Sequence, residues 1–134
     1  MKMNSFSKRS LLNLEGVHDD LKAVCEKAIE LSGDYGVDFI ITDGHRTMEE
    51  QIAFVSQGKS RTLKSRHLGG MAVDFVALVA GRVTYDVSAM TQVAECFKRA
   101  AAKLRIPIVW GGDWKSFKDT PHIELSKERY PDAE

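Results

Sequence analysis

The chain has few cysteines and no motif that pairs them. Cys25 and Cys96 are its two cysteines, and neither belongs to a Cys-x-x-Cys pair. The sequence therefore does not indicate a disulfide framework, a zinc knuckle or a dithiol redox centre. Both residues lie on the apolar face of an expected helix, so we predict buried thiols.

The sequence also lacks a long apolar run and an excess of charge of either sign. No segment approaches the length needed to cross a membrane, and the basic N-terminal residues precede no apolar core of a secretory signal. Lys plus Arg number 19, and so do Asp plus Glu, which gives no electrostatic reason to expect a nucleic-acid or membrane partner. We expect synthesis in the cytoplasm without a signal peptide.

The composition is that of a globular protein. Hydrophobic residues make up 43% of the sequence and charged residues 28%. Its 134 residues fit one domain. We expect a single domain over residues 1–134, with an ordered core of about 11–126 between a loosely held polar segment (1–10) and a charged tail.

Hydrophobic periodicity predicts three helices. Apolar residues recur at helical spacing over about 20–32, where Asp19 is expected to cap the helix, and over 88–104. A capping-box pattern from Thr47 to Glu50 predicts a helix that starts at Thr47 and ends at Gly58. Within it, Ile52 and Val55 are expected to face inward.

Short runs of apolar and β-branched residues predict the strands. They cover residues 38–42, 71–79, 82–85, 106–110 and 122–125. Helices mixed with strands that can form hairpins favour an α+β fold, in which a small antiparallel sheet is backed by helices.

Two stretches place metal-binding side chain types on these strands. His67 and Asp74 flank two glycines that let the chain bend, and His122 opens the last strand. A carboxylate buried without a partner costs several kcal/mol, and a metal ion would remove that cost for Asp74. A catalytic zinc site has three protein ligands and an open position. We therefore predict one Zn²⁺ held by His67, Asp74 and His122, in a cleft on the sheet.

Two further residues would complete a catalytic site. Asp119 lies three residues before His122, which suits a general base that takes a proton from zinc-bound water. Arg46 could stabilise the oxyanion that forms on the scissile carbonyl, or bind a substrate carboxylate. Glu124 shares a strand face with His122, so it is either a partner of a ligand histidine or a rival for the base.

Each of these residues also has a structural interpretation without function. His67 could be a satisfied polar residue, Asp74 could pair with Arg46 or Arg66, and Asp119 could cap a turn. For His18 and His45 we favour turn or capping roles, with His45 lining the cleft as a second choice. The remaining candidates stay open: the basic loop 59–66 is either a solvated face or a contact for an anionic polymer, and Trp114 and Phe117 are either cleft walls or a lid over the core.

Two motifs carry a resemblance to a known family. The pattern Ser-x-His-x-x-Gly-x-Ala-x-Asp is filled by residues 65–74, and Asp-x-Pro-His by residues 119–122. Together they resemble the zinc D-alanyl-D-alanine carboxypeptidases and L-alanyl-D-glutamate endopeptidases that cut bacterial cell-wall peptides, in particular the bacteriophage endolysin type. The stretches 16–18, 44–47 and 110–114 add to the likeness, which runs from about residue 14 to 125.

The resemblance implies a zinc metallopeptidase that hydrolyses the L-alanyl-D-glutamate bond of peptidoglycan stem peptides. The matching positions make His67, Asp74 and His122 the zinc ligands, Asp119 the catalytic base, Arg46 a contact of substrate or transition state, and Gln51 and Ser65 substrate-binding residues. His45 stands where relatives often have an aromatic residue. The alternatives are a D,D-carboxypeptidase that releases terminal D-alanine and a non-catalytic, zinc-stabilised wall-binding module. We expect a monomer that reaches the wall after the inner membrane is breached.

Overall fold

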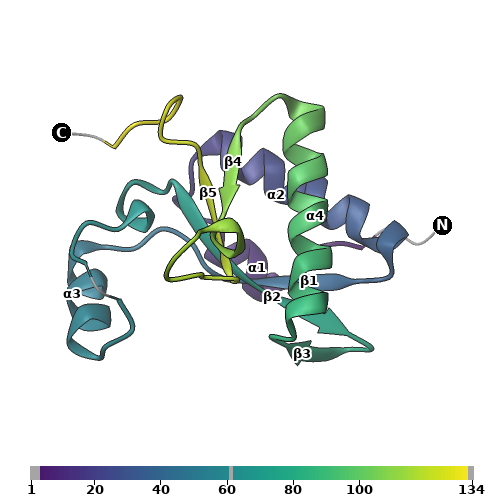
Figure 1. Ribbon diagram of the computed structural model, residues 1–134, viewed down its shortest axis with the longest axis horizontal. Helices are drawn as coiled ribbons and strands as arrows, with labels where there is room; N and C mark the ends of the chain where they lie inside the picture. The colour runs from purple at the N-terminus through teal and green to yellow at the C-terminus, as the bar shows by residue number, and fades with distance from the viewer. Residues whose placement is uncertain (1–3, 61, 133–134) are drawn as a thin grey trace.

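The computed structural model describes residues 4–60 and 62–132, which form helices around a small sheet (Figure 1). The α-helices are α1 (Lys8–Asn13), α2 (Asp19–Ser32), α3 (Met48–Ser56) and α4 (Val87–Leu104), and the 3-10 turns are η1 (Gly33–Tyr35), η2 (Arg66–Gly69) and η3 (Gly111–Asp113). The strands are β1 (Asp38–Asp43), β2 (Ala72–Val79), β3 (Arg82–Thr84), β4 (Ile108–Trp110) and β5 (His122–Leu125). The predicted α+β class is confirmed.

Strand β2 is the centre of the sheet. The strands follow the order β1-β2-β5-β4, β3 pairs with β2, and each of these pairs is antiparallel. Asp74 of β2 is in register with His122 of β5 on one side and with Asp43 of β1 on the other. Residues in register on neighbouring strands project to the same face of a sheet. The topology therefore gathers three polar side chains at one point.

The core lies between this sheet and the two long helices, which cross one another in Figure 1. Its largest fully buried side chains include Phe75 of β2, Phe97 of α4 and Leu21 of α2. The rings of Phe75 and Phe97 lie 5.3 Å apart between centroids. Burying each side chain of this size stabilises the fold by about 1.5–3 kcal/mol, so β2 is a rigid support for Asp74.

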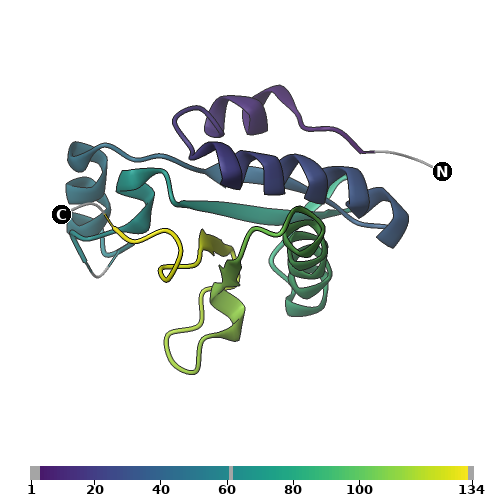
Figure 2. The ribbon, with the colours of Figure 1, turned by 90° about the horizontal axis from the view of Figure 1, so that it is seen from above.

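Helix α3 lies away from this core. Figures 1 and 2 both show it at the end of the long axis that is opposite the N-terminus. Its predicted start is confirmed, because Thr47 and Glu50 form a reciprocal capping box. The prediction that Ile52 faces inward is wrong: Ile52 is 49% exposed, and Gln51 is the fully buried residue of this helix. The inward face of α3 meets a polar network instead of apolar side chains.

The expectation of a loosely held N-terminal segment is wrong for residues 4–10, whereas residues 1–3 lie outside the described chain. Helix α1 buries Ser10, whose hydroxyl accepts a hydrogen bond from the Ile41 amide of β1 at 3.0 Å. The Asn4 side chain donates to the Val37 carbonyl at 2.8 Å. Polar composition concealed this segment because most of its contacts are hydrogen bonds, with Phe6 against Phe39 as an apolar contact.

Helix α2 starts one residue earlier than expected. His18 is the N-cap, and its Nδ1 accepts a hydrogen bond from the Asp20 amide at 3.0 Å. The capping role favoured for His18 is therefore confirmed, and the cap assigned to Asp19 is wrong.

The C-terminal segment also packs against the domain, beyond the expected core limit at residue 126. Tyr130 donates to the Asp20 carboxylate at 2.6 Å, and Asp132 pairs with Arg66 at 2.7 Å. Both cysteines are buried, as predicted, and burial raises the pKa of the Cys96 thiol to about 11. In the described part of the chain, no helix has the length and apolar character needed to cross a bilayer.

Candidate metal centre

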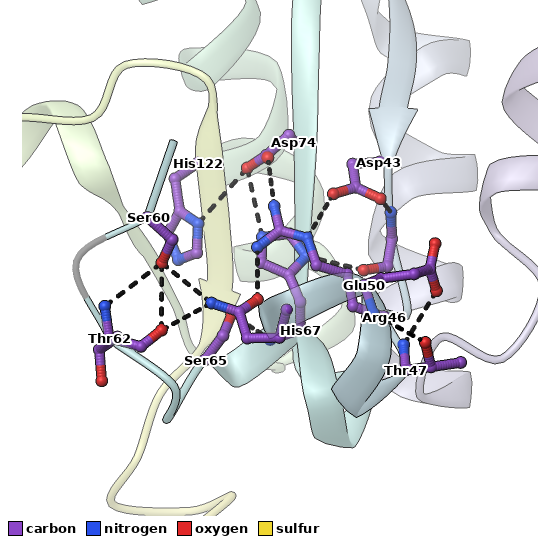
Figure 3. Close-up of polar contacts among 12 residues, drawn as sticks. Asp43, Arg46, Thr47, Glu50, Ser60, Thr62, Ser65, His67, Asp74 and His122 are labelled. Atoms are coloured by element: carbon purple, nitrogen blue, oxygen red, sulfur yellow. Dashed lines mark hydrogen bonds and ion pairs between the residues drawn. The ribbon is translucent and has the colours of Figure 1, made fainter. Parts of the chain in front are cut away.

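Three side chains from distant parts of the chain converge at one point. His67 comes from η2, Asp74 from β2 and His122 from β5 (Figure 3). The Asp74 Oδ1 atom lies 3.4 Å from His67 Nε2 and 3.5 Å from His122 Nδ1. One potential ligand atom from each residue lies within 4.8 Å of the other two. The predicted convergence is thus present in the structure.

Local backbone geometry produces this convergence. The register of β2 and β5 places Asp74 opposite His122. Gly70 ends η2 in the left-handed region, with φ of 70°, and a Cβ at this position would lie 2.5 Å from the Gly16 carbonyl oxygen. Glycine adopts this conformation without steric cost, so the chain can turn from His67 into β2 within a few residues.

Hydrogen bonds fix which nitrogen each histidine presents to Asp74. His67 Nδ1 lies 2.7 Å from the Gly44 carbonyl, which can only accept, so Nδ1 carries the hydrogen and the Nε2 lone pair faces Asp74. His122 Nε2 donates to Glu124 Oε1 at 2.8 Å, which leaves Nδ1 facing Asp74. Partners of this kind orient metal-binding histidines and raise their basicity.

These three side chains form a group that could hold a cation. Burial opposes ionisation of Asp74, but its contacts with His122 and His67 outweigh this effect and hold the pKa of Asp74 well below its usual range. Burial also opposes protonation of His122, yet the Asp74 and Glu124 carboxylates outweigh it and raise its pKa to about 9. A proton or a divalent ion can be held in this way, so the donor set fits a metal ion.

Arg46 supports the centre from the side of β1. Its Nε donates to Asp43 at 2.6 Å, its Nη1 to Gln51 at 2.9 Å and its Nη2 to Asp74 at 3.4 Å, and its guanidinium lies 4.1 Å from the Phe54 ring centroid. A cation between Asp43 and Asp74 removes the repulsion of two neighbouring carboxylates. These contacts use three of the five N–H donors of the guanidinium. The ion pair considered for Asp74 therefore forms with Arg46, beside the cluster.

Gln51 links Arg46 to the loop that follows α3. Its Oε1 accepts from Arg46, and its Nε2 donates to the Ser60 hydroxyl at 2.9 Å and the Thr62 carbonyl at 2.7 Å. The residue is fully buried. Its amide is committed to protein partners, which supports a positioning role instead of the substrate contact implied by the resemblance.

Glu124 and Arg66 form a second support, behind His122. Glu124 Oε2 lies 3.5 Å from Arg66 Nε, while Arg66 also pairs with Asp132 and donates to the Leu125 carbonyl at 2.8 Å. Arg66 is 6% exposed, so the interpretation of loop 59–66 as a solvated face is wrong for this residue. One sequence pattern indicates this support, namely the shared strand face of His122 and Glu124.

Asp119 lies beside the cluster without belonging to it. Its amide donates to the Gly111 carbonyl at 3.1 Å, and its own carbonyl accepts from the His122 amide at 3.1 Å. A Cβ at Gly111 would collide with the Asp119 carbonyl oxygen. Partial burial and the nearby Asp74 carboxylate raise the pKa of Asp119, which makes it a stronger base than an ordinary aspartate.

The cluster opens into a cavity of about 370 Å³. Its walls include Arg46, Ser65, Trp114 and Asp119, together with the three clustered residues. The Trp114 ring lies 5.2 Å from the His122 ring, so Trp114 is a cavity wall, whereas Phe117 is 71% exposed and is no lid over the core. His45 is exposed, packs near Gly16 and is absent from the lining.

The fold and site together define a class of protein: a small α+β domain whose His–Asp–His centre faces a cavity with a free carboxylate. The chain belongs to the phage L-alanyl-D-glutamate peptidase family, whose family model matches residues 2–130. This membership confirms the resemblance found in the two sequence motifs.

Named relatives agree with the family. The L-alanyl-D-glutamate peptidase of Listeria phage A118 is 37% identical over 91% of this chain and 42% of its own length, so this chain spans less than half of that protein. The enzyme of the same name from Escherichia phage T5 is 32% identical over 93% of this chain and 91% of its own length. The crystal structure of the Serratia marcescens L-Ala D-Glu endopeptidase ChiX is similar with a TM-score of 0.84 and 43% identity, over 95% of this chain and 93% of that one.

Proposed function

We propose that this chain is a zinc peptidase that hydrolyses the L-alanyl-D-glutamate bond of peptidoglycan stem peptides. Family membership supports the reaction, because the relatives named above are peptidases of that bond. One observation supports zinc catalysis above the others: His67 Nε2, His122 Nδ1 and Asp74 converge in a cavity that also contains Asp119. Two histidines and a carboxylate are a common donor set for catalytic zinc.

In this proposal His67, Asp74 and His122 hold the ion, and it supplies a Lewis acid that polarises the scissile carbonyl and lowers the pKa of water. Asp119 accepts the proton of the attacking water and returns it to the leaving nitrogen of D-glutamate. Asp119 lines the same cavity as the three ligands, so its carboxylate can reach a water beside them.

The surrounding residues set geometry and charge. Arg46 fixes Asp74 through its Nη2 and leaves part of its guanidinium for the oxyanion or for a carboxylate of the stem. Glu124 holds His122 in the tautomer that presents Nδ1. Ser65 lines the cavity, and its hydroxyl accepts a hydrogen bond from the His67 amide at 3.2 Å, so it positions the turn that carries His67.

The proposed setting is the cell wall of a bacterial host. As a lysis enzyme, the protein would act as a single copy on the stem peptides after the inner membrane is breached. The monomeric state is a prediction from the sequence, and sedimentation of the zinc-loaded protein tests it.

Mass spectrometry of purified peptidoglycan tests the reaction. After incubation with zinc-loaded protein, we expect stems released immediately after their first residue, no release with a chelator, and recovery when zinc is added back. Loss of a single terminal alanine would identify a D,D-carboxypeptidase. Unchanged peptidoglycan, combined with unfolding on metal removal, would identify a non-catalytic wall-binding module.

A further inference from the structure

The rim of the cavity carries positive charge that the metal centre does not use. Lys59, Lys64 and Lys127 line the cavity, and all three are exposed. Within residues 4–60 and 62–132, the ion pairs include no acidic partner for any of them. The whole chain has no net charge, so this excess is local.

The acidic residues of the cavity are engaged elsewhere. Asp74 lies between the two histidines and Arg46, and Glu124 lies between His122 and Arg66. The carboxylate of Asp119 belongs to the proposed reaction. Asp119 is therefore the one acidic residue of the described lining with no ion pair, against three lysines, of which Lys59 also lies 5.6 Å from the Phe54 ring centroid.

The loop that carries two of these lysines is held in place from the metal centre. A chain of hydrogen bonds runs from Asp74 through Arg46 and Gln51 to Ser60 and Thr62, two loop residues labelled in Figure 3. The loop backbone is fixed further by bonds from the Lys59 amide to the Phe54 carbonyl at 2.8 Å and from the Lys64 amide to the Thr62 hydroxyl at 3.0 Å. These bonds hold the backbone from which both lysine side chains extend.

The third lysine comes from a different segment, the end of β5. Lys127 follows β5, whose last residue, Leu125, accepts a hydrogen bond from Arg66, while the Ser126 amide donates to the Pro107 carbonyl at 3.0 Å. Two separate segments thus contribute positive charge to the cavity lining. A ligand between the loop and the end of β5 meets both.

The proposed substrate carries an anion on the residue that follows the bond to be cut. Glutamate has two carboxyl groups, one of which continues the stem. The other remains as a carboxylate on the residue whose nitrogen leaves when the bond is cut. We infer that Lys59, Lys64 and Lys127 form a carboxylate-binding rim, an inference that rests on the proposed function. This rim would favour stems whose D-glutamate has a free carboxylate over stems in which that group is an amide.

Binding can be measured apart from hydrolysis. The zinc-loaded Asp119→Asn protein should hold an uncleaved stem, so calorimetry gives a dissociation constant for two synthetic stems that differ only in glutamate acid or amide. We expect about 10-fold tighter binding of the acid at low salt, since charge-assisted contacts at an exposed rim are modest. The preference should shrink as ionic strength rises.

Substitutions of the three lysines test whether they cause the preference for the acid stem. Lys59→Gln combined with Lys64→Gln should weaken binding of the acid stem alone and so reduce its advantage over the amide stem to less than about 3-fold. Arginine at both positions should restore the preference. Lys127→Gln should lower the ratio partly. Lys103→Gln, at an exposed lysine of α4 outside the cavity, should leave it unchanged. Zinc content and thermal unfolding of each variant check that the centre and fold are intact.

The outcomes separate this inference from the proposed function. Equal binding of the two stems, or a ratio that survives the double substitution, overturns the carboxylate rim even if the wild-type protein cleaves both. A third stem, in which the carboxyl of the residue after glutamate is an amide, provides a further test. If binding weakens for that stem instead of for the glutamate amide, the inference is also overturned. Acid-selective binding by a wild-type protein that cleaves neither stem supports the rim and rejects the reaction.

Discussion

Arg66 and His67 are consecutive residues of η2, yet they support the metal centre from opposite sides. His67 points its Nε2 at Asp74, while Arg66 turns away and reaches Glu124, which in turn holds His122. A single 3-10 turn therefore provides one histidine of the cluster and, through Arg66 and Glu124, contacts the other. Movement of this turn would disturb both histidines together.

Glu124→Gln tests this support. The amide keeps the size of the carboxylate but loses its charge, so it weakens both the bond from His122 and the pairing with Arg66. We expect about 10- to 100-fold weaker zinc binding, the effect typical of changing the partner of a metal-binding histidine. Competition with a coloured chelator measures the affinity.

The matched control for Glu124→Gln is Glu128→Gln, because Glu128 is exposed on the same C-terminal segment. Its zinc affinity should equal that of the wild-type protein. If Glu124→Gln binds zinc with wild-type affinity, Glu124 does not orient His122, and the hydrogen bond between them has no role in the centre.

Asp119→Asn tests the proposed base. Asparagine fits the same space and leaves the three metal-binding residues unchanged, but it cannot accept the proton. Loss of a general base lowers kcat by about 10²- to 10⁴-fold. The zinc content of the purified variant should stay at the wild-type value. A variant with wild-type kcat would show that another group, with Glu124 as first candidate, takes the proton.

Gly111→Ala tests how the fold places that base. The added methyl group collides with the Asp119 carbonyl oxygen and forces the 119–122 turn outward. We expect a fall in kcat with a folded, metal-binding protein, measured by stem hydrolysis and zinc competition. Gly36→Ala provides a comparison, since space around that Cβ is open, although the φ of Gly36 is positive and that of Gly111 is not. It should lower stability without a selective loss of kcat.

The parts of this fold that sequence predicts are those with a repeating pattern. The strands around Asp74 and His122 and the two long helices show alternation or helical spacing, and β5 has the predicted bounds, His122–Leu125. The Thr47–Glu50 capping box was also visible, because each partner of that motif lies at a fixed offset. Residue types and local spacing were sufficient to predict that His67, Asp74 and His122 converge.

The supports of the site were less predictable because they depend on contacts between distant residues. Arg66 looks like one more basic residue of a polar loop, and its burial follows from partners that lie 58 and 66 positions later, at Glu124 and Asp132. Gln51 breaks the apolar pattern of α3 for a similar reason, since its partners lie before and after that helix. A single sequence has no local signal for either network.

The metal-free protein should lose stability as the pH rises from about 6.5 to 9. Its His122 has a pKa of about 9 when folded, against about 6.5 when unfolded, so the folded state binds the proton more tightly. The resulting stabilisation is complete below the unfolded pKa and is lost as the pH passes the folded pKa. We expect a decrease on the order of 2 kcal/mol, measured by urea unfolding in the presence of a chelator.

The matched variant for this measurement is His122→Asn, which cannot titrate in that range. The difference in unfolding free energy between wild-type and variant proteins isolates the contribution of His122 from those of other groups. This difference in unfolding free energy should become smaller from pH 6 to pH 9. Because zinc must replace the same proton, the apparent zinc affinity of the wild-type protein should rise over that interval. A difference that stays constant with pH would show that His122 is not held as an imidazolium beside Asp74.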